Sequence, residues 1–307
     1  MKRMPHYWLS VVCVVVGASS YGLLSPFIKK TYDAGYTFEQ LTVHQSGIGL
    51  LLLGIVALIR FRQWRNPFRG QWIKQSLVGV FGLSLTTVLY NLALMRLEAS
   101  FAIVLLFQFT WITILLDSVR QRAWPDRNKL IGVAFVMGGT LLAVGLMDAT
   151  FSRVDGAGIV YGFLSAVTYS LFIWLTGRLD RGSDPIVQSV VMMCAGFLFI
   201  VLLYGSKAGA GAAEGPLIGW GLLLGALGLV VPTVAFNIGI PRIGSSLAAL
   251  LGAVELPVAA LASWLMLGEQ LNAAKIAGIA LIFIGIGIAE RPGGNRPGSL
   301  TRLEEKR

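Results

Sequence analysis

One carboxylate differs from the other acidic residues of this sequence because it falls in the middle of a long apolar run. Glu255 lies at the centre of the run 244–266, whereas the other acidic residues lie at the ends of such runs or between them. If the run crosses a bilayer, a carboxylate at its centre costs about 2.5–3.5 kcal/mol on insertion scales and is by default functional. We therefore expect Glu255 to bind a proton or a cationic substrate group. The alternative is a protonated structural carboxyl that hydrogen-bonds to a neighbouring helix.

Other polar side chains lie in the middle of their own apolar runs and could share a pocket with Glu255. Gln108 is the centre of the run 99–117, and Ser20 and Thr168 are also mid-run. Short hydroxyl side chains in membrane helices usually bond to their own backbone or to a neighbouring helix, so each alone is a weak candidate. Their common depth with Glu255 favours a polar substrate-binding pocket.

Aromatic side chains could form the walls of this pocket and contact a ring or a cation. Tyr21, Trp111 and Tyr169 lie deep in their runs and are candidates for such walls. Tyr90 is another candidate for the wall, but it lies closer to the end of its run, where a tyrosine can instead be an interfacial anchor. Asn237 is expected mainly to bond across helices, with substrate contact as a secondary possibility.

The sequence offers no constellation for catalysis or for holding a metal or a cofactor. Cys13 and Cys194 sit in apolar runs, and we find no Cys/His metal spacing, phosphate-binding glycine loop or His-Glu-x-x-His motif. An intramembrane enzyme needs a nucleophile, a metal site or an aspartate pair within the membrane. We therefore predict no catalytic residue, no metal site and no cofactor.

Apolar helices must position these residues. Of the 307 residues, 55% are hydrophobic and 13% are charged, whereas a soluble domain carries about 25% charged residues. A bilayer core of about 30 Å needs about 20 apolar residues in a helix. Ten such runs can be placed, at approximately 8–28, 41–59, 73–95, 99–117, 130–147, 157–176, 186–205, 217–240, 244–266 and 272–289. We expect an all-α integral membrane protein with ten transmembrane helices.

The distribution of basic residues predicts the orientation of these runs, because cytoplasmic loops are enriched in Lys and Arg. With the N-terminus inside, most of the 25 Lys and Arg residues fall in inner segments, including 60–74 and 291–307. The net charge of +10 therefore reflects topology, and we expect no nucleic-acid partner. Both termini are predicted to be cytoplasmic in a multi-pass protein of the cell membrane.

The two halves of the chain resemble each other. A shift of 146 residues places the segment 87–91 on 233–237, and a shift of 148 residues places Tyr21 on Tyr169. Each half has five runs, so the second half must enter the membrane from the opposite side. We predict two inverted five-helix repeats around a central cavity, an arrangement typical of transporters. Their predicted limits are 1–150 and 151–290, followed by a disordered cytoplasmic tail at 291–307.

Motifs in the last two runs resemble those of a known family. Glu-Leu-Pro-Val-Ala-Ala at 255–260, with Leu-Gly-Glu at 267–269, is similar to the ninth helix of the EamA branch of the drug/metabolite transporter superfamily. The segment 275–287, with Gly278, Gly285 and Gly287, resembles the glycine-rich tenth helix of that family. The resemblance implies two five-helix halves and alternating-access transport of small metabolites, including amino acids.

The first half departs from the family pattern. Trp111-Ile112 stands where the fourth helix usually carries Pro-Val, and Arg122-Ala123 stands in place of Gly-Glu. Because the resemblance implies that this helix lines the central cavity, the departure affects the substrate class more than the fold.

We accordingly predict a secondary transporter that moves a small metabolite across the cell membrane by alternating access, with export favoured. An amino acid, a related compound or a drug-like cation are the candidate substrates. The expected partners are the small-molecule substrate and the lipid bilayer. Protons as coupling ions and assembly as a homodimer are further possibilities. The alternatives are an intramembrane enzyme and a non-transporting regulatory scaffold or channel, although nothing in the sequence resembles a selectivity filter.

Overall fold

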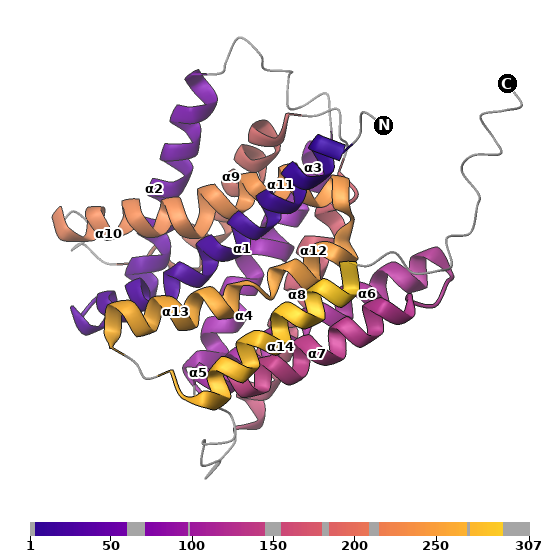
Figure 1. The fold of residues 1–307 in the computed structure, drawn as a ribbon. Coiled ribbons are helices and arrows are strands. Elements are labelled where there is room, and N and C mark those ends of the chain that lie inside the picture. Colours follow the sequence, from indigo (N-terminus) through magenta and orange to yellow (C-terminus); the bar gives the residue numbers. More distant parts are fainter. Residues whose placement is uncertain are drawn as a thin grey trace, which may run out of the picture.

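All regular structure in the described part of the chain is helical (Figure 1). The computed structural model describes residues 4–59, 71–97, 99–144, 155–179, 184–208, 215–268 and 271–290. The predicted tail at 291–307 and the end of the predicted run 130–147 lie outside these ranges.

The helices follow one another in two similar series. The first series is α1 (Met4–Asp33), α2 (Phe38–Ile59), α3 (Trp72–Leu77), a π-helical segment (Val78–Ser84), α4 (Leu85–Leu94), α5 (Ala99–Leu106), α6 (Phe109–Gln121) and α7 (Arg127–Ala143). The second series is α8 (Gly156–Thr176), α9 (Pro185–Tyr204), α10 (Gly215–Gly225), a π-helical segment (Ala226–Val230), α11 (Val231–Ile243), α12 (Ser245–Gly252), α13 (Glu255–Leu267) and α14 (Ala273–Glu290).

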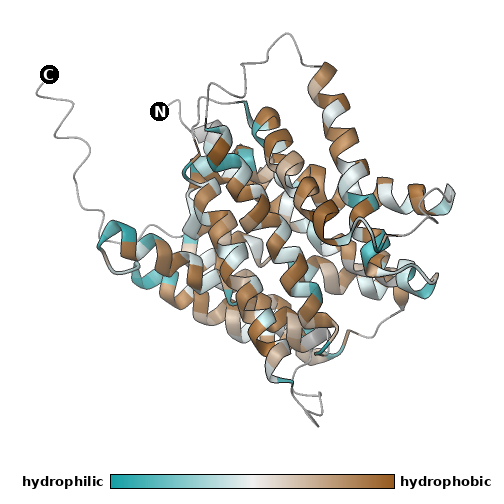
Figure 2. Cartoon of the chain, turned by 180° about the vertical axis from the view of Figure 1, so that it is seen from behind, coloured by the Kyte–Doolittle hydropathy of each residue, from teal (hydrophilic) through white to brown (hydrophobic). Residues whose placement is uncertain are grey.

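The described residues contain nine helical stretches that are long and apolar enough to cross a membrane. They are Tyr7–Asp33, Phe38–Ile59, Trp72–Leu94, Phe101–Gln121, Gly156–Thr176, Pro185–Tyr204, Gly215–Ile243, Ser245–Leu267 and Ala273–Glu290. The helix at the position of the predicted fifth run, α7, has 17 residues and is shorter than these. Hydrophobic residues cover the outer sides of the helices, and hydrophilic residues gather towards helix ends (Figure 2). The predicted all-α membrane class is confirmed.

Local sequence signals set several helix ends. Asp155 precedes α8 and accepts a 2.9 Å hydrogen bond from the backbone N–H of Ala157. Asp184 caps α9 in the same way and is followed by Pro185 at the first helical position, where the missing N–H of proline costs nothing. Gly244, with φ 89°, separates α11 from α12, a conformation that favours glycine.

Two predicted spans are broken at equivalent positions. The run 99–117 is interrupted between α5 and α6, and the run 244–266 is interrupted between α12 and α13. The two interruptions are separated by the 146-residue offset of the sequence repeat. Pro257 lies in the first turn of α13, where proline is tolerated. The first half has no proline at the matching place, so proline is not required for the break.

The helix pairings also repeat when the halves are exchanged. Helix α1 packs against α11 and α13, and its counterpart α8 packs against α4 and α6. The two fifth helices, α7 and α14, lie side by side (Figure 1), as do the two second helices, α2 and α9. The fold therefore brings the middle of α1 and α8 to the centre, where the two halves meet.

Glycine permits the close approach of α7 to α14. A Cβ atom added to Gly139 would lie 2.6 Å from the carbonyl oxygen of Gly278, and one added to Gly285 would lie 2.8 Å from that of Gly132. Both contacts are with backbone, which cannot move aside without shifting a helix. Glycine at these positions therefore permits the close packing of α7 against α14.

We expect Gly139→Ala to lower the stability of the protein by about 1–3 kcal/mol, the usual cost of overpacking. Gly138→Ala is the matched control, because a Cβ atom at Gly138 meets no other atom within 4 Å. Thermal unfolding of the two purified variants in detergent measures the difference. Equal midpoints for both variants would show that the contact of α7 with α14 is looser than described.

Candidate functional site

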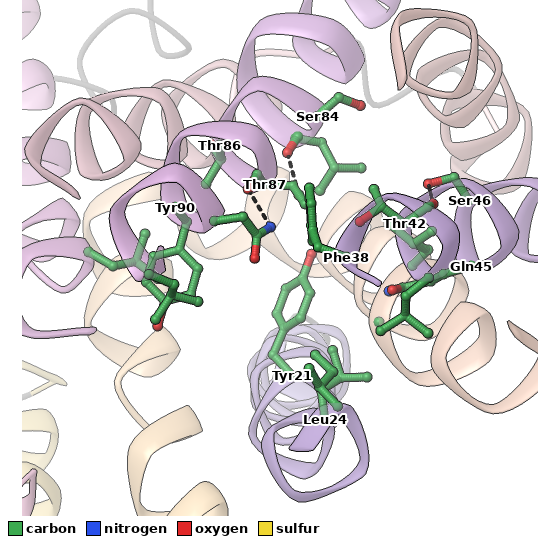
Figure 3. Close-up of a pocket in the computed structure, with 18 of the residues that line it drawn as sticks. Tyr21, Leu24, Phe38, Thr42, Gln45, Ser46, Ser84, Thr86, Thr87 and Tyr90 are labelled. Carbon is green, nitrogen blue, oxygen red and sulfur yellow. Dashed lines mark hydrogen bonds between the residues drawn. The ribbon is translucent and has the colours of Figure 1, made fainter. Parts of the chain in front are cut away.

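A cavity of about 240 Å³ lies between the two halves of the chain. Most of its wall comes from α1, α2 and α4, and the second half contributes Tyr169 of α8, Ile200 of α9, Gly228 and Leu229 of the π-helical segment, and Glu255 of α13. In Figure 3 the ring of Tyr21 rises from α1 between α4 and α2. The cavity extends to Tyr32 and Phe38, near the end of α1 and the start of α2.

Glu255 lines this cavity as the first residue of α13. The sequence placed it in the middle of a continuous helix, whereas the break before α13 puts the carboxylate at a helix N-terminus. The helix dipole favours a negative charge there. Gly22 of α1 touches the same turn, because a Cβ atom at Gly22 would lie 2.5 Å from the carbonyl oxygen of Glu255. Glycine at position 22 therefore allows the start of α13, with Glu255, to pack closely against α1 beside the cavity.

The Glu255 carboxylate has no hydrogen-bond or ion-pair partner among the described residues. None of the described residues that line the cavity is Lys, Arg or His. A carboxylate in an apolar setting is stabilised by a cation or by hydrogen-bond donors. The group is thus available to a ligand.

An aromatic cluster forms one side of the cavity at the centre of the molecule. The rings of Tyr21 and Tyr169, which are repeat mates, meet edge to face with centroids 6.4 Å apart. Phe109 packs on Tyr169 with a centroid distance of 4.7 Å. Phe109 is the first residue of α6 and is the repeat mate of Glu255, so the two halves place a ring and a carboxylate at equivalent positions.

Polar side chains from α2 and α4 complete the wall. Ser46 donates to the carbonyl oxygen of Thr42 at 2.7 Å, and Thr87 donates to that of Leu83 at 3.1 Å. The Asn91 amide nitrogen donates to the carbonyl oxygen of Thr87 at 2.6 Å. These donors are satisfied within their own helices, which leaves oxygen acceptors such as the Asn91 side-chain carbonyl for other partners.

The structure brings three of the eight predicted site residues to the cavity, namely Glu255, Tyr21 and Tyr169. Thr168 lies behind the wall, where it accepts a 2.7 Å hydrogen bond from the cavity-lining Thr86. Ser20 is buried and donates to the carbonyl oxygen of Leu227 at 2.6 Å.

The remaining three predicted residues lie away from the cavity lining. Gln108 accepts a 2.8 Å hydrogen bond from the indole N–H of Trp111. Trp111 is 36% exposed on α6. Asn237 is buried and donates to the hydroxyl of Ser189 at 2.8 Å, which is the cross-helix bond that the sequence suggested.

Sequence reasoning missed the polar wall. Thr42, Gln45 and Ser46 follow the i, i+3, i+4 spacing of one helix face, and Thr87 and Asn91 are four residues apart on α4. Such spacing inside an apolar run indicates a polar stripe, and this signal could have identified the wall.

The repeat mates of three residues in the α4 part of the cavity wall are buried. Thr87, Tyr90 and Asn91 of α4 line the cavity, whereas their mates Thr233, Phe236 and Asn237 of α11 are at most 2% exposed. The Thr233 hydroxyl and the Asn237 side-chain oxygen have no hydrogen-bond partner in the described residues. Leaving a buried polar group unpaired costs about 1–3 kcal/mol. The two halves therefore differ in how far their equivalent surfaces are open.

A polar network joins three helices at the other end of the bundle. Asp117 of α6 accepts hydrogen bonds from the hydroxyl of Ser245 and from the backbone and hydroxyl of Ser246 at the start of α12. The guanidinium of Arg178, just after α8, lies 2.8 Å from the same carboxylate and 3.6 Å from the centre of the Trp174 ring.

This network and the cavity lie towards opposite ends of α1. Gly239 of α11 packs on Ser10, so the junction of α11 with α12, next to the network, is near the start of α1. The cavity extends to Tyr32, near the end of α1. The network therefore joins α6, α12 and the end of α8 on the side away from the cavity.

Comparison with known proteins agrees with the architecture. The sequence profile of the EamA-like transporter family matches residues 8–145 and 156–290. An uncharacterized transporter of Bacillus subtilis, YcbK, is 25% identical over 286 residues, covering 90% of each chain. The uncharacterized protein PA1977 of Pseudomonas aeruginosa is 28% identical over 297 residues, covering 93% of this chain and 97% of its own. A crystal structure with 16% identity superposes with a TM-score of 0.75 over 94% of this chain and 97% of that chain.

Proposed function

This chain belongs to the EamA-like transporter family of the drug/metabolite transporter superfamily, and on that premise we propose that it is a secondary transporter of a small metabolite working by alternating access. The observation that carries the proposal is the cavity between the two halves, with an unpartnered carboxyl group in its wall. As a multi-pass membrane transporter, the protein contacts lipid and a small-molecule substrate. Family and fold favour transport over enzymatic activity.

The proposed topology has ten spans in two inverted repeats, with α7 as the fifth span. A 17-residue helix is at the short end of the range that crosses a bilayer. The repeats are taken as 1–150 and 151–290, with both termini and the tail 291–307 in the cytoplasm. The matching helix breaks and the exchanged helix pairings support this assignment.

Unequal burial of equivalent residues supports alternating access. The state described has Thr87 and Asn91 at the cavity and their mates Thr233 and Asn237 buried. In the alternate state the second pair would face water, which would satisfy the polar atoms that are now unpaired. With the termini in the cytoplasm, the cavity lies towards the outside and the Asp117 network closes the cytoplasmic end. Export stays the proposed direction of transport, as favoured from the sequence.

In this scheme Glu255, Tyr21 and Tyr169 contact the substrate directly. Thr168 and Ser20 hold the surrounding helices, and Asn237 contacts substrate only in the alternate state. Gln108 and Trp111 remain predicted substrate-binding residues, but they do not line the cavity in this state. Proton coupling through Glu255 and assembly as a homodimer stay predictions.

The test is transport by purified protein in proteoliposomes. Amino acids, polyamines, sugars and hydrophobic cations are first screened for thermal stabilisation, since a ligand at 100 times its Kd stabilises the native state by about 2.7 kcal/mol. Radiolabelled hits are then measured for uptake and for exchange against internal unlabelled ligand. We expect at least one hit to exchange faster than in protein-free liposomes. A folded protein that binds a hit but never moves it would contradict the proposal.

A further inference from the structure

The geometry points to a substrate class for this cavity: we propose that it takes a small organic ammonium ion with an aromatic or apolar body, and that it discriminates against amino-acid zwitterions. The inference rests on the proposed function, because it assigns a ligand to the transport site.

The charge pattern of the cavity lining favours a cationic ligand. Glu255 supplies the only carboxyl group among the described residues that line the cavity, and Lys, Arg and His are absent from that lining. It has no cationic partner in the described ranges, so a single positive group on the ligand would complete the missing ion pair. A zwitterion would add its own carboxylate to a cavity that offers no Arg or Lys to receive it. Like charges in such a site are unfavourable.

Hydrogen bonding in the wall formed by α2 and α4 also favours an ammonium group. Ser46, Thr87 and Asn91 already donate to carbonyl oxygens of their own helices. Each keeps an oxygen acceptor. An ammonium group has several N–H donors and no acceptor, so it matches these three oxygens. A carboxylate would compete with backbone carbonyls for these three donors and would depend on other donors in the wall, such as the Gln45 amide.

The size and chemistry of the remaining wall favour a small ligand with an aromatic or apolar body. Tyr21, Tyr90 and Tyr169 lie around the cavity together with apolar side chains such as Leu83 and Ile103. Tyrosine faces attract cations and pack against rings. The volume of about 240 Å³ restricts the ligand to a small molecule. A ligand with an ammonium group at Glu255 and a ring among the tyrosines would match the carboxyl group, the oxygen acceptors and the aromatic wall.

Four compounds that share one phenyl group test this inference: 2-phenylethylamine, 2-phenylethanol, 3-phenylpropanoate and phenylalanine, which are respectively cationic, neutral, anionic and zwitterionic. Their affinities are measured by thermal stabilisation and isothermal titration at neutral pH, using the full chain and Glu255→Gln. We expect the amine to bind the natural protein at least about tenfold more tightly than the other three. The preference should disappear in Glu255→Gln, in which the carboxylate is absent but the shape is kept.

The outcomes separate the ligand class from the transport proposal. Equal binding of the amine and the alcohol would overturn the inference, because Glu255 would then take only a proton. A preference for phenylalanine or phenylpropanoate, a preference for the amine that survives in Glu255→Gln, or no binding of the amine would also overturn it. Flux is measured separately in proteoliposomes. Exchange of phenylalanine but not of the amine would reject the ligand class and keep the transporter, whereas amine binding without flux of any ligand would keep the site and reject transport.

Discussion

Asp117→Ala should shift the protein towards a state open at the end of the bundle where α1 begins. The carboxylate now holds the start of α12 and Arg178 against α6, through bonds from Ser245, Ser246 and the guanidinium. Removing one partner of a buried ion pair costs about 3–5 kcal/mol. The side chains of Asp117 and Arg178 are 11% and 23% exposed, so the loss of the pair should cost less, about 2 kcal/mol. This free energy corresponds to about a 30-fold increase in the ratio of the open to the closed state.

Hydrogen–deuterium exchange of the segment 240–250 measures this opening. We expect exchange in Asp117→Ala to be about 30-fold faster than in the natural protein. Asp117→Asn should change it in the same direction but less, because the amide oxygen can still accept from Ser246. Asp126→Ala is the matched control, since this acid precedes α7 without a side-chain cap bond. Unchanged exchange at 240–250 in both Asp117 variants would show that the network does not hold this end closed.

Glu255→Gln should make the protein more stable and less active. The carboxylate has no partner in the described residues, so an amide of the same shape removes an unfavourable charge and should add about 1–2 kcal/mol of stability. Transport of a cationic substrate should fall by at least about 100-fold, because a charge-assisted contact of about 3 kcal/mol is lost. Gains in stability at the expense of function are typical of functional sites.

Thermal unfolding and proteoliposome exchange of the same preparations measure the two effects. Asp33→Asn, at the exposed end of α1, is the control for loss of one negative charge. A Glu255→Gln protein that is markedly less stable than the natural one would indicate that Glu255 is a structural carboxyl with a partner.

Much of the architecture follows from the sequence because apolar runs of bilayer length and a repeated register constrain it strongly. The depth of Glu255, and its neighbourhood with Tyr21 and Tyr169, could also be predicted, since these residues are mid-run in their own spans. The depth of a residue in its span does not show on which side of the helix its side chain lies. Gln108 and Trp111 have the right depth, but they bond to each other away from the cavity.

Two other features depend on the folded structure and cannot be read from an apolar run. The break before α13 makes Glu255 a helix N-terminal residue, and hydrophobicity is continuous across it. Asp117 looked like a residue marking a helix end, yet it is hydrogen-bonded to Ser245 and Ser246, which follow it by more than 120 residues. Such a contact between distant segments needs the assembled helix bundle before it can be identified.

Paired cysteine labelling tests most directly whether one cavity is reached from each side of the membrane in turn. Thr87→Cys and Thr233→Cys are made separately in a background without Cys13 and Cys194, and membrane-impermeant thiol reagents are added to vesicles of known orientation. We predict that Thr87→Cys reacts from the outside and Thr233→Cys only from the cytoplasmic side. Ligand should change the two rates in opposite directions. Labelling of both positions from the same side, or of Thr233→Cys from neither side under any condition, would contradict the account.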